Sequence, residues 1–191
     1  MYLIIKRILD IILSLVAIII FSPLFLIVSF AIRIDSKGPI IFKQKRPGIN
    51  HKIFTIYKFR TMKVETPNIS TEELGDPSQY ITKLGLFLRK SSLDEIPQLF
   101  NILKGDMSIV GPRPALYNQD NLILMRENEG IDRVKPGLTG YAQVRGRDNI
   151  SDLEKVEYEK YYKENMSFIF DLKIIWWTVQ SVLKSEGVRT N

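Results

Sequence analysis

An apolar run from about Ile11 to Ile32 contains no charged residue, and it limits what the chain can fold into. A helix of about 22 residues is roughly 33 Å long, which is enough to cross the hydrocarbon core of a bilayer. Pro23 interrupts the run directly after Ser22. Because proline has no N–H, it deprives the carbonyl of Ile19 of its helical partner, and the Ser22 hydroxyl offers a local hydrogen bond. We therefore expect a kink at residues 22–23.

Basic residues flank the apolar run on both sides, with Lys6 and Arg7 before it and Arg33 and Lys37 after it. The positive-inside rule favours the cytoplasm for both flanks. A re-entrant segment that breaks at Ser22-Pro23 and returns to the same face satisfies this rule, because each half, roughly 17 Å long, reaches only mid-bilayer. A single spanning helix with a tolerated proline is the alternative. A signal peptide fits less well, since the run is long and no small-x-small cleavage site follows it.

The remaining chain, about 155 residues, is long enough for one compact domain with its own core. The net charge of the whole chain, +6, suits anionic lipid, a phosphate-bearing substrate or nucleic acid, without choosing among them. The sequence contains no cysteine, and its one histidine, His51, lies in a probable turn. Carboxylates are therefore the best candidates for any acid–base or nucleophilic chemistry.

The order of sequence patterns predicts an α+β fold that is mostly helical. β-Branched and aromatic residues on both sides of Pro47-Gly48 predict a β-hairpin over residues 39–62. We expect a loop over 63–79, an extended turn over 108–114 and an irregular segment over 134–147. The final helix, with Trp176 and Trp177, could lie on a membrane surface or in the core. Helices are expected over residues 80–90, 91–104, 115–129, 151–164 and 167–184.

Asp94 and Glu95 are adjacent carboxylates near a predicted helix start. One interpretation is structural, because Ser92-x-x-Glu95 matches a capping box and the helix dipole favours acidic residues in a first turn. The other is functional: a carboxylate nucleophile or metal ligand beside basic residues and a helix N-terminus.

Basic residues occur just before the carboxylates and recur in the loops that follow them. A solvated basic surface would explain each of them singly, but as a set on proline- and glycine-rich loops they suggest an anion site. No nucleotide fingerprint or nucleic-acid module accompanies them. The candidate phosphate-binding residues are Arg89, Arg113, Lys135, Arg145 and Arg147.

The blocks "IFKQKRPG", "IYKFRTM", "SSLDEIPQLFNILKGDMSIVGPRP" and "VKPGLTGYAQVRGR" resemble the small monotopic phosphoglycosyl transferases of the bacterial sugar transferase family. The resemblance covers nearly the whole chain and includes the Ser22-Pro23 break. It implies a re-entrant membrane helix over residues 1–36, and a catalytic domain over 37–191 with membrane-surface amphipathic helices. It places this domain on the cytoplasmic face of a bacterial inner membrane.

The resemblance also implies a reaction, the transfer of a sugar phosphate from a UDP-sugar to polyprenyl phosphate with release of UMP. Asp94 would be the nucleophile that forms a phosphosugar–aspartate intermediate, Glu95 the second carboxylate, and Mg²⁺ would be held by the pair. We expect the sugar to be an N-acetylated amino sugar. A membrane-tethered protein that binds lipid or nucleic acid without turnover is the alternative, and the sequence does not indicate an oligomeric state.

Overall fold

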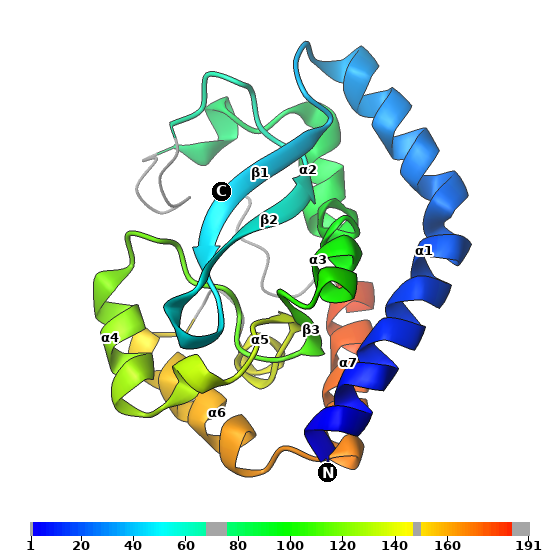
Figure 1. The fold of residues 1–191 in the computed structure, drawn as a ribbon. Helices are drawn as coiled ribbons and strands as arrows, with labels where there is room; N and C mark the ends of the chain where they lie inside the picture. The colour runs from blue at the N-terminus through cyan, green and yellow to red at the C-terminus, as the bar shows by residue number, and fades with distance from the viewer. Residues whose placement is uncertain (1, 68–75, 147–149, 185–191) are drawn as a thin grey trace.

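The computed structural model describes residues 2–67, 76–146 and 150–184, and in these ranges the chain is mostly helical (Figure 1). A β-hairpin and a second two-stranded sheet complete the fold, which confirms the predicted mostly helical class with a small hairpin. The helices are α1 (Tyr2–Asp35), α2 (Lys83–Lys90), α3 (Gln98–Lys104), α4 (Asp120–Asn128), α5 (Tyr141–Arg145), α6 (Asp152–Glu164) and α7 (Phe168–Lys184). The strands are β1 (Ile41–Pro47), β2 (Ile53–Phe59), β3 (Ser108–Val110) and β4 (Gly137–Thr139), and the 3-10 turns are η1 (Ile49–His51), η2 (Pro77–Gln79), η3 (Leu93–Glu95) and η4 (Ile131–Arg133).

The helix α1 runs along one side of the molecule and bends along its length (Figure 1). Pro23 lies inside it, and the Ser22 hydroxyl donates a 2.8 Å hydrogen bond to the carbonyl of Ile19. The predicted local compensation for the missing proline N–H is thus confirmed. In the described part of the chain, only α1 is long and apolar enough to cross a membrane. Its return to the same membrane face stays a prediction.

Polar contacts attach the N-terminal half of α1 to the rest of the molecule. Lys6 forms a buried ion pair with Asp171 of α7, and the Asp10 carboxylate accepts a 3.0 Å hydrogen bond from the backbone N–H of Ile109. Arg7 donates to the carbonyl of Ile102, near the end of α3, where a positive charge is favoured. Polar groups in a membrane-type helix are costly unless they are paired, and these are paired with the folded domain.

Apolar packing attaches the C-terminal half of α1 to the same domain. Val28 and Ile32 are buried against Phe59 of β2 and Leu88 of α2. Arg60 then fixes the connection that follows α1, because its guanidinium donates to the carbonyls of Ser36 and Lys37 at 2.7 and 2.6 Å. Both ends of α1 are therefore attached to one folded unit. The opposite face of α1 is apolar and exposed over its whole length, as at Leu3, Ile8, Ile12, Ile19, Ile27 and Phe30.

The predicted hairpin is present as the antiparallel pair β1–β2, with Ile41 opposite Phe59 and Pro47 opposite Ile53. Its turn contains two residues in the left-handed region, Asn50 at φ 50° and His51 at φ 59°. One face of β2 carries Phe54 and Ile56, which are buried against α3. The hairpin therefore lies directly beside the segment that contains the two candidate carboxylates.

The parallel pair β3–β4 corrects two expectations, because residues 108–114 and 134–147 were predicted to be an extended turn and irregular. Glycines that suggested a loop instead allow two backbones to approach closely. A Cβ atom on Gly111 would lie 2.3 Å from the carbonyl oxygen of Lys135, and one on Gly137 would lie 2.1 Å from the N atom of Gly111. Strands of three residues also carry too little alternation to be recognised in a sequence. The short helix α5 follows in the segment that was expected to be irregular.

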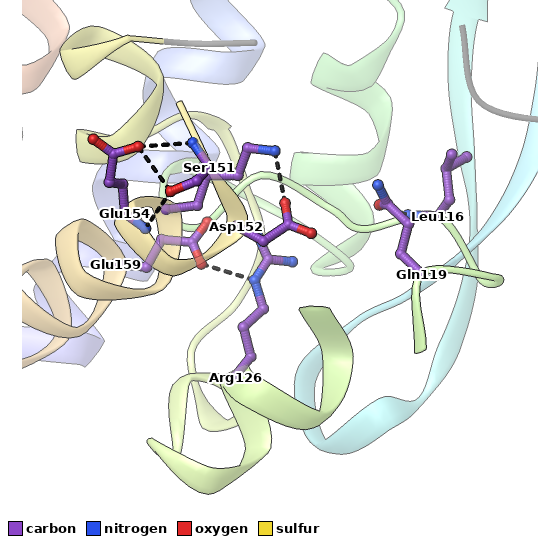
Figure 2. Close-up of polar contacts among 8 residues, drawn as sticks. Leu116, Gln119, Arg126, Ser151, Asp152, Glu154 and Glu159 are labelled. Atoms are coloured by element: carbon purple, nitrogen blue, oxygen red, sulfur yellow. Dashed lines mark hydrogen bonds and ion pairs between the residues drawn. The ribbon is translucent and has the colours of Figure 1, made fainter. Parts of the chain in front are cut away.

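The predicted helices are present with shifted ends. α4 begins later than expected because residues 115–119 form a turn, in which the side-chain oxygen of Gln119 accepts a 2.8 Å bond from the backbone N–H of Leu116 (Figure 2). α2 begins after Thr82, which caps it. The segment 91–104 forms η3 and α3 separately, and α3 ends at Gly105 with φ 93°. In the expected loop 63–79, η2 is regular and residues 68–75 lie outside the described ranges.

Two polar arrangements hold α6 in place (Figure 2). Ser151 and Glu154 form a reciprocal capping box at its start. Arg126 of α4 forms two hydrogen bonds, of 2.7 and 2.6 Å, with the buried carboxylate of Glu159. In α7, Ile174 is fully buried in the core, whereas another face is apolar and exposed, and contact of that face with a membrane stays a prediction. That exposed face contains Ile169, Leu172, Trp176, Val179 and Leu183.

Candidate active site

The two candidate carboxylates lie on the 3-10 turn η3, and the capping-box interpretation of this turn is wrong. Ser92 adopts a left-handed conformation at φ 56° and makes no capping hydrogen bond to the turn. Glu95 bonds basic side chains instead, with its Oε1 atom 2.7 Å from Lys58 Nζ and 3.3 Å from an Arg113 nitrogen. In these contacts both partners carry a full charge, and they orient the Glu95 side chain toward the two cations.

Asp94 is buried, with only 8% of its surface exposed. Burial raises its pKa from 3.8 to about 6 and Glu95 adds to this rise, while Lys58, Arg89 and Arg113 oppose it. A carboxyl group with such a perturbed pKa beside several cations is a frequent feature of functional sites.

The basic residues near the carboxylates come from the hairpin and from two loops. Arg46 of β1 donates to Gln44 at 2.6 Å and to the Pro114 carbonyl at 3.1 Å. Burial and the nearby Arg113 lower the pKa of Arg46 to about 10. Four cations therefore surround two carboxylates, and the excess of positive charge favours an anion at this place. The four are Arg46, Lys58, Arg89 and Arg113.

A buried amide places Lys58 beside Glu95. Asn101 of α3 donates from Nδ2 to the carbonyl of Thr55 at 2.7 Å, and its Oδ1 accepts from the backbone N–H of Tyr57 at 3.0 Å. The Asn101 side chain thus occupies the edge of β2 where a further strand would pair. This fixes α3 against β2, and so brings Glu95, just before α3, next to Lys58.

Two cavities meet at η3. A pocket of about 280 Å³, called the polar pocket here because it contains the charged side chains, is lined by Asp94 with Gln44, Arg46, Lys58 and Arg89, and also by apolar side chains such as Phe42 and Leu116. An apolar cavity of about 460 Å³ lies between α1 and α7 and is lined at one side by Ser92 and Glu95. The turn η3 therefore separates a pocket that contains basic side chains from an apolar cavity.

The structure brings together only part of the predicted phosphate-binding set. Arg89 and Arg113 lie near the carboxylates. Lys135 instead lies near Arg7, Asp10 and Asp106, and burial lowers its pKa. Arg145 lies over the rings of Tyr141 and Trp177, at 5.0 and 5.5 Å from their centroids. Arg147 lies outside the described residues.

Sequence reasoning missed Lys58 and Arg46 as site residues. A usable signal was present for Lys58, because alternation along β2 puts it on the same face as Phe54 and Ile56. That face packs against α3, which begins just after the carboxylates. The sequence contains no such signal for Arg46, because its position depends on a contact between the hairpin and the distant loop at Pro114.

The donor set fits a magnesium ion only in combination with a substrate. Within residues 2–67, 76–146 and 150–184, no group of three or more His, Cys, Asp or Glu side chains could hold a metal ion. Mg²⁺ is commonly bound by one or two carboxylates together with substrate phosphates. Asp94 and Glu95 could supply the carboxylates of such a site.

The fold and the site define a domain with a membrane-type helix and an anion pocket built around a buried carboxylate. The model of the family "Bacterial sugar transferase" matches residues 1–185, and the chain belongs to this family of transferases. An uncharacterised sugar transferase of Bacillus subtilis, EpsL, is 44% identical over 97% of this chain and 91% of its own length.

Larger relatives match only in part of their length. The UDP-glucose:undecaprenyl-phosphate glucose-1-phosphate transferase of Klebsiella pneumoniae is 41% identical over 91% of this chain and 39% of its own. The UDP-N-acetylgalactosamine-undecaprenyl-phosphate N-acetylgalactosaminephosphotransferase of Aeromonas hydrophila is 37% identical over 98% of this chain and 46% of its own. The chain thus spans less than half the length of these two relatives.

Proposed function

We propose that this transferase moves a sugar 1-phosphate from a UDP-sugar to polyprenyl phosphate and releases UMP. One observation carries the proposal: the buried Asp94 faces a basic pocket, while its neighbour Glu95 borders an apolar cavity. A polar donor and a lipid acceptor need two such environments at one reacting centre. The names of the relatives from Klebsiella and Aeromonas support the same reaction class. Membership in a transferase family argues against a tethered protein that only binds lipid or nucleic acid.

Asp94 is the proposed nucleophile of the first step. Its carboxylate oxygen attacks the sugar-linked phosphorus, the bond from this phosphorus to the bridging oxygen breaks, and UMP leaves with that oxygen. In the second step a phosphate oxygen of the acceptor attacks the same phosphorus, and the bond to Asp94 breaks. Covalent catalysis of this kind divides a transfer between two anionic partners into two steps at one site.

Electrostatics explain why cations surround this carboxylate. A carboxylate and a diphosphate repel each other, and Arg46, Lys58, Arg89 and Arg113 compensate for this repulsion. Glu95, paired with Lys58 and Arg113, keeps two of these cations in fixed orientations at the border of the second cavity. Mg²⁺, held by Asp94 and Glu95 together with the phosphates, would neutralise further charge on the diphosphate.

The attachment of α1 supports a monotopic arrangement with the catalytic domain on the cytoplasmic face of a bacterial membrane. A helix that crosses a bilayer separates its two ends by the thickness of the membrane. Both ends of α1 instead contact one folded unit, through Lys6 with Asp171 and through Ile32 with Phe59. The exposed apolar faces of α1 and α7 would then contact lipid.

The test is UMP release from a panel of UDP-sugars in the presence of polyprenyl phosphate. We expect release with at least one donor and propose an N-acetylated amino sugar, although the relatives' names include both glucose and N-acetylgalactosamine donors. Product analysis should find polyprenyl diphosphate sugar in the same amount as UMP. No release from any donor on the panel would contradict the proposed reaction.

A further inference from the structure

The apolar cavity lies between two helices from opposite ends of the sequence. α1 contributes Leu13, Ala17 and Phe21 to its wall, and α7 contributes residues that include Val179 and Val182. Its volume of about 460 Å³ lies within the range of about 300–1,000 Å³ that is typical of small-molecule sites. Its lining is apolar apart from a few hydroxyl and amide groups and Glu95, so a hydrocarbon is the suitable occupant.

Glu95, the one charged residue among the described residues that line this cavity, belongs to the carboxylate site, and it contacts two cations that do not themselves line the cavity. Glu95 lines the cavity and bonds Lys58 and Arg113 at 2.7 and 3.3 Å. A ligand with an anionic head at these cations could therefore place an attached apolar chain in the cavity. A polar soluble ligand would leave the apolar walls uncovered, and burying its polar groups there would be costly.

The opposite side of the cavity reaches the apolar surface of the molecule. Phe21 and Val179 line the cavity and are also partly exposed, at 41% and 47% of their surface. Neighbouring side chains on both helices, such as Ile20 and Leu183, are exposed and apolar. A long chain could thus leave the cavity toward lipid without crossing a polar surface.

We propose that this cavity binds the first isoprene units of the polyprenyl phosphate acceptor, with the phosphate toward Lys58 and Arg113. This inference rests on the proposed function, which supplies a phosphate carried on an isoprenoid chain. The head lies at the cations, the first units lie between α1 and α7, and the remaining chain lies in the bilayer. The cavity therefore recognises the acceptor, while the polar pocket at Asp94 recognises the donor.

The test measures binding of a long-chain polyprenyl phosphate to the full chain in detergent micelles, without UDP-sugar. Val179→Phe puts a larger side chain into the cavity from α7 at a position that is half-exposed and so tolerant. Each displaced methylene should weaken binding by about fourfold, so we expect the Kd to rise roughly tenfold or more. Leu183→Phe is the matched control, because Leu183 lies on the same helix, is exposed and does not line the cavity. Its Kd should be unchanged.

A second pair of variants tests the opposite wall. Ala17→Phe enters the cavity from α1, whereas Val16→Phe lies on the exposed face of the same helix. We expect Ala17→Phe to raise the Kd for polyprenyl phosphate and Val16→Phe to leave it unchanged. The unfolding temperatures of both variants show whether each one folds. A short, water-soluble isoprenyl phosphate contains the same first isoprene units, so its affinity should fall by a similar factor in the cavity variants.

Three results would overturn the inference. They are an unchanged Kd in both cavity variants, equal losses in the cavity variants and their controls, or equally tight binding of phosphatidic acid in place of polyprenyl phosphate. The assay contains no donor, so it is independent of turnover. Binding that depends on Val179 without any UMP release would contradict the proposed reaction alone, whereas UMP release with unaltered binding would contradict the cavity assignment alone.

Discussion

Asp94 and Glu95 are adjacent in sequence, yet their side chains line different cavities, Asp94 the polar pocket and Glu95 the apolar one. They lie on the 3-10 turn η3, where three residues complete a turn and successive side chains diverge by about 120°. A regular α-helical start would also separate them, but the left-handed Ser92 before η3 sets the direction of both. Two carboxylates of the same chemistry can therefore have different roles.

Substitution of each carboxylate should separate these roles. We expect Asp94→Asn to lower UMP release by roughly a thousandfold or more, because an amide cannot act as the nucleophile. Glu95→Gln should still release a burst of UMP with the donor alone. The rate of its acceptor step should fall more than the rate of its donor step, because Lys58 and Arg113 lose their shared partner. Rapid-quench measurement of UMP, with and without acceptor, checks both. Near-normal UMP release by Asp94→Asn would exclude it as the nucleophile.

The pH dependence of the donor step should report the ionisation of Asp94. The carboxylate must be ionised to attack, and burial raises its pKa to about 6. We therefore expect kcat/KM for the UDP-sugar to fall as the pH is lowered through about 6, well above the range of an ordinary aspartate. Lys58→Met should shift this fall in kcat/KM to still higher pH, because Lys58 opposes the rise of the Asp94 pKa. A fall in kcat/KM only near pH 4 would contradict a buried nucleophile.

The same raised pKa predicts a stability effect of known sign. A folded-state pKa above the ordinary 3.8 means that the folded protein binds more protons between about pH 4 and 6. Asp94 therefore favours folding below this window and disfavours it above pH 6. We expect Asp94→Asn to be more stable than the parent protein at pH 8, by on the order of 1–3 kcal/mol, and the difference to shrink near pH 4. Denaturant unfolding at both pH values measures it.

Local features of this fold could be predicted from the sequence, and contacts between distant segments could not. The bond from Ser22 to Ile19 follows from the chemistry of one helical turn, and the hairpin follows from alternation around Pro47-Gly48. The pair β3–β4 joins short strands about 30 residues apart, so no local pattern indicates it.

The site shows the same division between local and distant information. Asp94 and Glu95 stood out as an acidic pair, and Arg113 stood out between two prolines. The capping box predicted for Ser92 and Glu95 competed with two cations that come from elsewhere in the chain, and the cations prevailed. A matching Ser-x-x-Glu pattern does form a capping box at Ser151, where the side chains are exposed.

The buried pair of Arg126 and Glu159 should be important for stability, and Glu159 also accepts a hydrogen bond from the backbone of Arg113. Arg126→Met leaves the Glu159 carboxylate buried without its partner, and we expect a loss of about 3–5 kcal/mol in the free energy of unfolding. Replacing both residues by Met should recover much of this loss. The exposed pair of Lys160 and Glu129 is the control, since Lys160→Met should leave the stability almost unchanged. Equal effects of the two single variants would contradict the buried role.

Magnesium should bind with the donor and not before it. The described residues contain no group of three metal-ligating side chains, so in the proposed magnesium site the substrate phosphates would supply further ligands. We expect EDTA to stop turnover and added Mg²⁺ to restore it. Mg²⁺ alone should leave the unfolding temperature unchanged, while Mg²⁺ with a UDP-sugar should raise it. Full activity in excess EDTA with metal-free substrates would contradict a metal requirement.

The topology of α1 can be tested with single cysteines, because the chain has none of its own. Leu3→Cys and Asp35→Cys are at exposed positions near the two ends of α1, and Lys52→Cys marks the side of the catalytic domain. A membrane-impermeant thiol reagent is applied to intact spheroplasts and again after the membrane is opened. If both ends of α1 lie on the cytoplasmic side, all three sites are labelled only after opening. Labelling of Leu3→Cys from outside, with the other two protected, would show a spanning helix.

The contacts of α1 also predict what holds this topology. Ser22→Ala with Pro23→Ala should restore the missing helical bond to Ile19 and favour a straighter helix. Lys6 with Asp171, and Arg60 with Ser36, would still attach both ends to the domain. We therefore expect the double variant alone to keep Leu3→Cys protected from outside. Adding Lys6→Met leaves Asp171 without its charged partner and should release the N-terminal half, so that part of Leu3→Cys becomes labelled from outside. Complete labelling in the double variant alone would show that the break at Ser22-Pro23, and not the attachment to the domain, determines the topology.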